Sequence, residues 1–330
     1  MKRITLETLI SLENIKKLKA NLLITGGGTG NAFATAEAIK NNFENEINLI
    51  VADINPRHLV SAGNFADYYE EVPLISDTRY KEAVLGLAKK YEINALIPFI
   101  DSDVLEMSKW SEDGSLSSDV FLQVKSTQIA EICGDKQLAF FWLKENGINT
   151  PETFSLNEEI NHQKFIIKPK SGFGSVVREV SVDEVSQLDE IQKYIGQEMC
   201  SSPEVTIDVF YSESDSLFRY LCRERVETKA GVCTKARIFI DPELERLARF
   251  LATSLRLSFF CFQVMQLGGK WAVTDINPRL GAGTAMSTAV GMDFFAAMIA
   301  VILKKNPRPY IDQFLGEAYV TRQYVNIKSR

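Results

Sequence analysis

The sequence predicts an α/β protein in two parts, a doubly wound α/β domain followed by a mixed α+β half. Two observations indicate the first part: strand-like apolar runs alternate with helix-like runs, and the first strand ends in a glycine turn. This order is typical of a parallel sheet with helices on its faces. The second part is indicated by strand-like runs that follow one another after residue 126. We therefore expect the second half to form a sheet of its own.

In the first half, "NLLITGGG" (21–28), "INLIVAD" (47–53) and "NALIPFID" (94–101) are the expected strands. "AFATAEAIKNNF" and "YKEAVLGLAKKY" are the expected helices; in the latter, apolar residues recur at helical spacing, namely Ala83, Val84, Leu87, Ala88 and Tyr91. "SDVFLQV" (118–124) should close the domain. Residues 1–20 lack the apolar block of a signal peptide, so a helix leading into the first strand is expected there.

In the second half, "STQIAEICGDKQLAFFWLKENGINTPET" should be helical until Gly147 and Pro151. Two strands around a glycine loop are expected in "KFIIKPKSGFGSVVREV", and two more in "IGQEMCSSPEVTIDVFYS". "PELERLARFLATSLRL" is an amphipathic helix, with one apolar face made of Leu244, Leu247, Leu251 and Leu255.

Composition excludes several classes of function. The 330 residues carry a formal net charge of −6 without a basic run, which argues against nucleic-acid partners. No apolar run is long enough to cross a bilayer. The five cysteines are scattered, as expected for reduced thiols in a cytoplasmic protein. Neither His58 nor His162 lies near a nucleophile motif, so the chemistry should rest on carboxylates, lysines, arginines or a metal.

One hairpin carries a candidate metal site. If Gly268, Gly269 and Lys270 form a three-residue loop, residue 267 pairs with 271, and 265 with 273. Gln263 then lies opposite Asp275, with Asn277 two residues along on the same face. Such oxygen donors can hold Mg²⁺ together with phosphate groups, and Arg279 beyond the strand could clamp a phosphoryl group. The alternative is a polar sheet face with a capping arginine.

Two glycine runs could approach an anion. In "FIIKPKSGFGSVV" (165–177), Lys168 precedes the glycines and a strand follows them, unlike a P-loop; a loop over phosphates and a simple β-hairpin both remain open. "GGGTGN" (26–31), with Asp53 after the next strand, resembles a dinucleotide fingerprint. Its third glycine position is Asn31, which favours a plain strand-to-helix turn.

Basic residues alternate along "LCRERVETKAGVCTKARI" (221–238). Arg223 and Arg225 should share a face of a strand, as should Lys235 and Arg237. A solvated edge strand and a wall that binds phosphate or carboxylate would both give this pattern.

The order of these motifs resembles the ATP-grasp superfamily, in particular its carbamoyl-phosphate-synthase-like and PylC-like carboxylate–amine ligases. "NLLITGGG", "VADINPRHLVSAGNFADYYEEVP" and "NALIPFIDSD" resemble the Rossmann-like domain that precedes the ATP-grasp fold in those enzymes. The resemblance implies a pre-ATP-grasp domain at 1–125, a small lid subdomain at 126–196 and a large subdomain at 197–330, the last two clamping ATP.

The resemblance also assigns roles to individual residues. Lys136 matches a lysine that reaches the nucleotide phosphates, and Lys168 one near adenine and the α-phosphate. Glu204 matches the carboxylate that takes the ribose hydroxyls. The lid loop corresponds to Ser171, Gly172, Gly174, Ser175 and Val176, and the hinge beside adenine to Glu198, Met199 and Cys200. The metal ligands would be Gln263, Asp275 and Asn277, with Arg279 beside the γ-phosphate.

The implied activity is ATP-dependent activation of a carboxylate as an acyl phosphate, which an amine or ammonia then attacks. ATP and Mg²⁺ (or Mn²⁺) would be the cofactors, small acids and amines the substrates, and a homodimer a common assembly. The expected cations are Arg223, Arg225, Lys235 and Arg279. Asp101, Ser102 and Asp103 follow a strand of the first domain, where open α/β sheets present ligands, so they should face the site.

The sequence differs from the family at three points. The second metal position, usually Glu, is Asp275; the first is the neutral Gln263; and the glycine usual before the ribose glutamate is replaced in "SSPE". These differences leave open a nucleotide-binding sensor or regulatory protein with reduced turnover. A dinucleotide-dependent oxidoreductase that uses "GGGTGN" is the other alternative, but it leaves the second half without a role.

Overall fold

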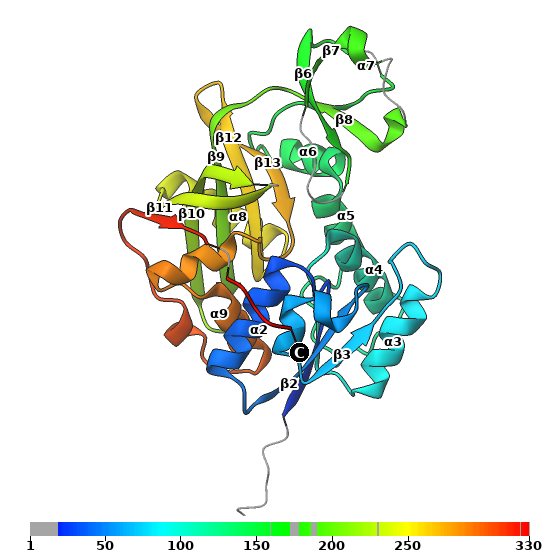
Figure 1. The fold of residues 1–330 in the computed structure, drawn as a ribbon. Helices are drawn as coiled ribbons and strands as arrows, with labels where there is room; N and C mark the ends of the chain where they lie inside the picture. Colours follow the sequence, from blue (N-terminus) through cyan, green and yellow to red (C-terminus); the bar gives the residue numbers. More distant parts are fainter. Residues whose placement is uncertain are drawn as a thin grey trace, which may run out of the picture.

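A computed structural model describes residues 19–158, 160–171, 178–185, 190–229, 231–323 and 325–329. The chain forms a four-stranded parallel sheet, a small four-stranded sheet and a large six-stranded sheet (Figure 1). The helix expected in residues 1–20 lies outside the described residues, except that Ala20 begins the first strand. No helix of the described ranges is long and apolar enough to span a membrane.

The N-terminal domain has the predicted doubly wound character. Its sheet contains β1 (Ala20–Thr25), β2 (Ile47–Asp53), β3 (Tyr68–Glu71) and β4 (Ala95–Pro98) in the order β3-β2-β1-β4, with every pair parallel. Leu22 and Ile24 enter one apolar cluster, and Leu23 enters another. Strand β1 is therefore covered on both faces, as in other parallel sheets.

The helices of this domain are α2 (Gly30–Asn42), α3 (Tyr80–Lys90) and α4 (Asp101–Glu112), with short 3₁₀ turns at η1 (Arg57–Leu59) and η2 (Ser61–Asn64). Residues 118–124, expected to close the domain, belong to no named strand, and Phe121 makes an isolated bridge to Ala95. Two residues later the Gln123 amide donates to the carbonyl of Pro278, 2.7 Å away, so the chain leaves the parallel sheet for the second half.

Two helices lead into the second half. The predicted helical stretch is divided into α5 (Thr127–Gly134) and α6 (Lys136–Glu145), because the Asp135 side chain caps the first turn of α6. Buried residues of both helices, such as Ala130 and Leu143, join the core of the large sheet. Although the sequence groups these helices with the small sheet, they therefore pack beneath the large one.

The small sheet forms the upper part of Figure 1. It contains β5 (Thr153–Ser155), β6 (Lys164–Pro169), β7 (Arg178–Ser181) and β8 (Tyr194–Gln197) in the order β5-β8-β6-β7, with α7 (Val182–Val185) and η3 (Ile191–Lys193). Antiparallel pairing of β6 with β7 confirms the predicted strands around the glycine loop. Phe165, Ile167 and Val180 belong to a separate apolar cluster, so this sheet has its own core.

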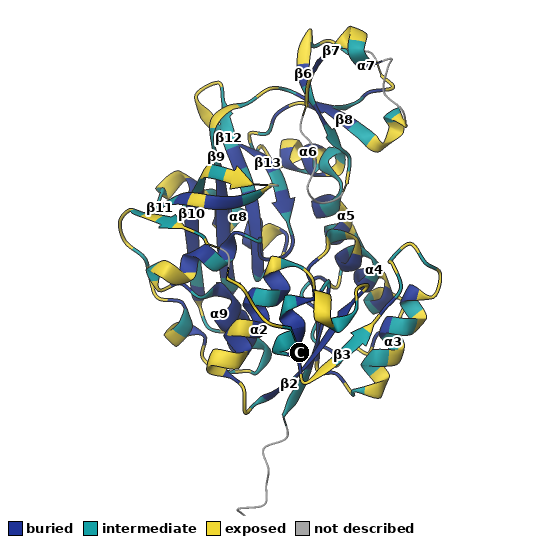
Figure 2. Ribbon diagram, viewed as in Figure 1, coloured by how far each residue is buried: buried dark blue, intermediate teal, exposed yellow. Residues whose placement is uncertain are grey.

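The large sheet is antiparallel, in the order β13-β12-β9-β10-β11-β14. Its strands are β9 (Ser201–Ser212), β10 (Leu217–Lys229), β11 (Val232–Phe239), β12 (Phe259–Leu267), β13 (Lys270–Asn277) and β14 (Ala318–Thr321). Helix α8 (Pro242–Ser254) buries Leu244 and Leu251 against it, as its amphipathic pattern predicts. Figure 2 shows buried residues concentrated in the central strands of this sheet.

The N-terminal domain and the large sheet share one core. Phe43 of the first domain lies in the same apolar cluster as Phe294 and Phe295 of α9 (Phe294–Ile302). The remaining short turns are η4 (Thr284–Val290) and η5 (Arg308–Tyr310). These two parts are thus packed together, while the small sheet stands on the far side of a cavity.

Candidate active site

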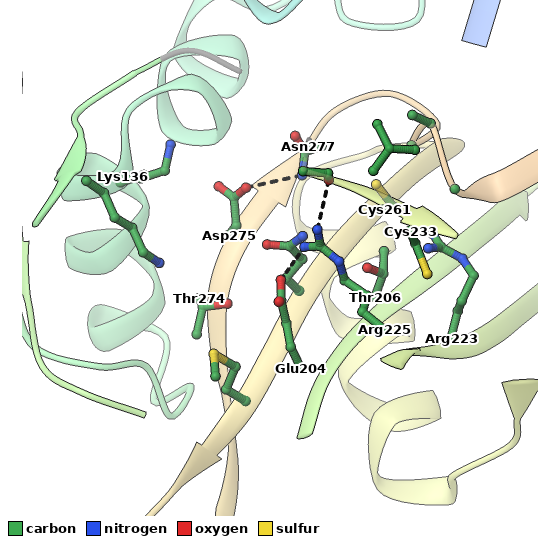
Figure 3. A pocket seen from close by; sticks show the side chains of 18 of the residues that line it. Lys136, Glu204, Thr206, Arg223, Arg225, Cys233, Cys261, Thr274, Asp275 and Asn277 are labelled. Carbon is green, nitrogen blue, oxygen red and sulfur yellow. Dashed lines mark hydrogen bonds and ion pairs between the residues drawn. The ribbon is translucent and has the colours of Figure 1, made fainter. Parts of the chain in front are cut away.

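A cavity of about 430 Å³ separates the small sheet from the large one. Lys136 of α6 lies across the cavity from Asp275 of the β12–β13 hairpin (Figure 3). Lys168 of β6 and Gln263 of the hairpin also line the cavity. A glycine-containing segment, residues 281–283, lies at one end. The cavity therefore gathers residues that are distant in sequence but were singled out together from their motifs.

The hairpin brings Gln263 opposite Asp275, as predicted, but by a different register. The loop has two residues rather than three: Leu267 pairs with Lys270, and both Gly268 and Gly269 have positive φ, 60° and 76°. Such a turn requires left-handed residues at both positions, which glycine supplies without strain. A register shift at Val264, where Thr274 is the extra residue on β13, restores the Gln263–Asp275 pair.

Three oxygen-bearing side chains of this hairpin line the cavity: Gln263, Asp275 and Asn277. The Asn277 amide donates to Asp275 over 3.4 Å. Within the described ranges, no group of three or more His, Cys, Asp or Glu is placed to hold a metal ion. The set contains one carboxylate and two amides, so it fits a hard cation that receives further oxygens from a bound phosphate group.

Arg279 lies just beyond β13 and is 5% exposed. Its Nε is 2.8 Å from Oδ1 of Asp101, and its Nη2 donates to Oδ2 of the same carboxylate at 3.1 Å. A second bond runs from Nη2 to Asn277 Oδ1 over 3.3 Å. Asp101 is the first residue of α4, where the helix N-terminus favours a carboxylate. The guanidinium is thus oriented by a residue of the N-terminal domain.

Arg223 is held by an aspartate that the sequence did not single out. Asp208 of β9 is fully buried and accepts from Arg223 Nε at 3.1 Å and from Nη2 at 3.2 Å. Burial lowers the pKa of Arg223, but the Asp208 carboxylate more than offsets this and the pKa is raised above its ordinary value. The Thr284 hydroxyl also donates to Asp208 at 2.6 Å and accepts from the Gly281 amide at 2.9 Å. This network ties Arg223 to the segment that follows Arg279.

Arg225 lines the cavity beside Glu204, with which it forms an ion pair. Its Nη2 also donates to the carbonyl of Gly231 at 2.8 Å. Glu204 keeps 34% of its side chain exposed, so its carboxylate reaches the cavity while paired. The arginine therefore orients the carboxylate to which the resemblance assigns the ribose.

The structure does not place Lys235 in the cavity. Register shifts interrupt the pairing of β10 with β11 after Arg225, where Val226 has no partner, and again beside Thr234. Arg225 itself pairs with Ala236, so Lys235, one residue away on β11, lies on the opposite face of the sheet by ordinary strand alternation. Its amine pairs with Glu227 at 2.8 Å and is 54% exposed. The predicted basic wall is therefore made by Arg223 and Arg225 alone.

The two lysines lie on the other side of the cavity. Lys168 Nζ donates to Gln197 Oε1 at 2.7 Å, and the Gln197 amide donates to the Thr153 hydroxyl at 3.0 Å. The pKa of Lys168 is lowered, chiefly by burial and also by the nearby charge of Lys136. The charge of Asp275 acts in the opposite direction and raises it. Lys136 is the first residue of α6, and its backbone amide donates to the carbonyl of Lys170. Their ammonium groups face the same space as the hairpin oxygens.

The segment after β8 connects the two sheets. Met199 and Cys200 line the cavity, and burial raises the pKa of the Cys200 thiol. The Glu198 carboxylate instead accepts from the amide of Glu152 at 3.2 Å, and Glu198 is not among the described cavity residues. Ser171 is exposed at the end of β6. The other predicted lid residues, Gly172, Gly174, Ser175 and Val176, lie outside the described residues.

The sequence matches two protein-family models. Residues 22–117 match the model described as PylC-like, N-terminal domain, and residues 133–283 match the model described as ATP-grasp domain. The chain therefore contains an ATP-grasp domain that follows a PylC-like N-terminal domain. No curated protein sequence matches it.

Solved structures show the same ATP-grasp fold at low sequence identity. N5-carboxyaminoimidazole synthetase from Staphylococcus aureus, complexed with ADP, has a TM-score of 0.75 and 16% identity over 94% of this chain and 84% of that one. L-amino acid ligase from Bacillus licheniformis gives 0.65 and 15% over 87% and 75%. Phosphoribosylglycinamide synthetase from Anaerococcus prevotii gives 0.64 and 16% over 89% and 77%. At these identities the likeness establishes the fold alone.

Within this ATP-grasp protein, the resemblance of "GGGTGN" to a dinucleotide fingerprint has a structural cause. Asp53 accepts from the amide of Gly28 at 2.7 Å and from the amide of Asn55 at 2.9 Å, so the chain itself occupies its carboxylate. A Cβ at position 27 would lie only 2.5 Å from a side-chain carbon of Val51, so the close packing at Gly27 requires glycine. Asn31 is buried and donates to the carbonyl of Leu280. The dinucleotide alternative is therefore not favoured.

Of Asp101, Ser102 and Asp103, which were all expected to face the site, Asp101 alone is among the described residues that line the cavity. Asp103 is buried inside the N-terminal domain, where it accepts from the Thr25 hydroxyl at 2.7 Å; burial raises its pKa. Sequence reasoning also missed Asp208. Its one signal was an aspartate within the apolar run "EVTIDVF", which requires a partner when buried.

Proposed function

We propose that this ATP-grasp protein is an ATP-dependent ligase that joins a carboxylate to an amine or ammonia. The observation that carries the proposal is the cavity itself, because Lys136 and Lys168 face Gln263, Asp275 and Asn277 across it. Two ammonium groups opposite a set of oxygen donors suit a polyphosphate whose other side is bound by a cation. The shared fold with proteins named as synthetases and a ligase supports the same conclusion.

The reaction has two steps. A carboxylate oxygen of the acid attacks the terminal phosphorus of ATP, the bond to the β-phosphate oxygen breaks, and ADP leaves. The amine nitrogen then attacks the acyl carbon, the bond from that carbon to the phosphate oxygen breaks, and the nitrogen loses a proton as inorganic phosphate leaves. Both steps need anions to be neutralised and held in line.

Each side chain has a part in this scheme. Lys136 and Lys168 would hold the phosphates, Met199 and Cys200 would contact the adenine at the hinge, and Glu204 would bind the ribose. The cations directed toward the acid and the transferred phosphoryl group are Arg223, Arg225 and Arg279. Water must be excluded from this site, because it would otherwise hydrolyse the acyl phosphate.

Mg²⁺ or Mn²⁺ held by Gln263, Asp275 and Asn277 would neutralise phosphate charge. The single carboxylate makes this ligand set weak, so a nucleotide-binding regulatory protein with little turnover is a second candidate.

Five free thiols, of which Cys133, Cys222, Cys233 and Cys261 are buried, fit a reducing, cytoplasmic location.

The test is Mg²⁺-dependent release of ADP from ATP with pools of acids and amines. The wild type is compared with an Asp275→Ala/Asn277→Ala double variant, and with Lys270→Ala, an exposed position on the same strand, as the control. Release that needs one acid–amine pool, persists in Lys270→Ala and disappears in the double variant supports the ligase. If ADP never appears but ATP raises the melting temperature, the regulatory candidate replaces it. If no ADP appears and ATP does not raise the melting temperature, the proposal is wrong.

A further inference from the structure

The segment Pro278–Leu280, directly after β13, is held by the N-terminal domain at consecutive residues. Gln123 donates its amide to the carbonyl of Pro278 at 2.7 Å and also to the carbonyl of Phe259. Asn31, which is 3% exposed on α2, donates to the carbonyl of Leu280 at 2.9 Å. These bonds fix the backbone on both sides of Arg279.

Between them, Asp101 holds the side chain of Arg279 itself. Asp101 Oδ2 accepts a hydrogen bond from Nη2 at 3.1 Å, and Oδ1 lies 2.8 Å from Nε as an ion pair, so the carboxylate holds the guanidinium in place. The same Nη2 donates to Asn277 Oδ1, at the end of the predicted metal site. A shift of the guanidinium would therefore also release the Asn277 amide.

We propose that Asn31, Asp101 and Gln123 form a clamp through which the N-terminal domain positions Arg279 for phosphoryl transfer. The inference rests on the proposed function. All three are positioning residues: they act on Arg279 and its backbone rather than on substrate. Because orientation within a fraction of an ångström governs the rate of in-line transfer, the clamp sets turnover.

The nucleotide-binding side of the cavity is built separately. Lys136, Lys168, Met199 and Cys200 belong to α6, the small sheet and the segment after it, none of which lies in the N-terminal domain. Loosening the clamp should therefore lower kcat while leaving the KM for ATP close to that of the wild type. A residue needed only for folding would not separate the two constants in this way.

The variants are Asp101→Asn, Gln123→Ala and Asn31→Ala, with Glu106→Gln as the control on the same helix as Asp101. Glu106 pairs with Lys109 at the surface, so neutralising it should change nothing. Each clamp variant should lose about 10- to 100-fold in kcat, the range seen for partners that orient an active-site group. Asp101→Glu, which keeps the charge on a longer arm, should recover part of the Asp101→Asn loss.

Hydrogen exchange gives a readout that needs no turnover. In the nucleotide-free protein, the amides of residues 279–284 should exchange faster in Gln123→Ala and Asn31→Ala than in the wild type and in Glu106→Gln. If Asp101→Asn does not fold, these two variants carry the test.

Wild-type kcat in the folded clamp variants, a loss confined to the KM for ATP, or unchanged exchange in residues 279–284 would each overturn the inference. A wild type that releases no ADP refutes the ligase instead. In that case the exchange experiment still decides whether the clamp holds the segment.

Discussion

Replacing Asp208 with asparagine tests the buried network beneath the cavity. Asp208 is completely buried, and its carboxylate accepts from Arg223 Nε, Arg223 Nη2 and the Thr284 hydroxyl at 3.1, 3.2 and 2.6 Å. The variant keeps the size of the side chain but removes its charge. Arg223, only 2% exposed, would then be a buried cation without its carboxylate.

Breaking a buried ion pair by removing one partner costs about 3–5 kcal/mol, and we expect a loss of this size in the free energy of unfolding. The three hydrogen bonds share one carboxylate, so their separate contributions are not added. Urea unfolding followed by circular dichroism measures the change. Asp119→Asn, at an exposed position of the N-terminal domain, is the matched control and should unfold as the wild type does.

The decisive variant removes both charges. A hydrophobic pair of similar volume often matches a buried ion pair in stability, so Asp208→Leu/Arg223→Met should be more stable than Asp208→Leu alone. Two results would refute the reasoning: a loss below about 1 kcal/mol in Asp208→Asn, the range of exposed pairs, or a double variant whose loss equals the sum of the two single losses.

Two further predictions concern the cavity walls. Since burial lowers the pKa of Lys168 and a bound polyanion would raise it again, nucleotide binding should take up protons and weaken as the pH rises through that lowered pKa. Affinity measured from neutral to alkaline pH should lose this dependence in Lys168→Met but keep it in Lys164→Met, whose side chain is 71% exposed on the same strand. Gly283→Ala would place a Cβ 2.2 Å from Nη1 of Arg223, so we expect about 1–3 kcal/mol of destabilisation and loss of turnover. Gly86→Ala in α3, where a Cβ meets nothing within 4 Å, should be neutral or stabilising; equal unfolding midpoints for the two alanine variants would contradict the packing argument.

Much of the fold could be predicted because its signals are local. Alternation of strands and helices gave the parallel domain, and apolar spacing gave the buried face of α8. The contact between the Gln123 side chain and Pro278 could not be predicted in this way, because the two residues are 155 positions apart in the chain. Pairing at that distance leaves no trace in local periodicity.

The candidate site, too, could be predicted only where its signals are local in the sequence. Opposition of Gln263 and Asp275 could be derived from strand geometry, although the assumed loop was one residue too long and a bulge at Thr274 compensates for it. Lys235, in contrast, faces away from Arg225 by ordinary strand alternation, because Arg225 pairs with the neighbouring Ala236. Bulges depend on tertiary packing as well as on sequence, so a face predicted by counting residues holds only as far as the next bulge.

The pairing of charges suggests how the two sides of the cavity divide their work. Arg223, Arg225 and Arg279 each meet a carboxylate, from Asp208, Glu204 and Asp101 respectively. Among the described residues, Lys136 and Lys168 form no ion pair. An arginine held by a carboxylate contributes direction and little net charge, whereas an unpaired lysine contributes charge that a polyphosphate can neutralise.

Affinity for the nucleotide should therefore depend mainly on the two lysines, and turnover on how rigidly the arginines are held. The lysines lie on the small sheet and α6, and the small sheet has a core of its own. The arginines are fixed to the large sheet and, through Asp101, to the N-terminal domain, which share one core. We expect a bound polyphosphate to be attracted mainly by the lysine side, because within the described part of the chain the charges of Lys136 and Lys168 are not paired with carboxylates whereas those of the three arginines are.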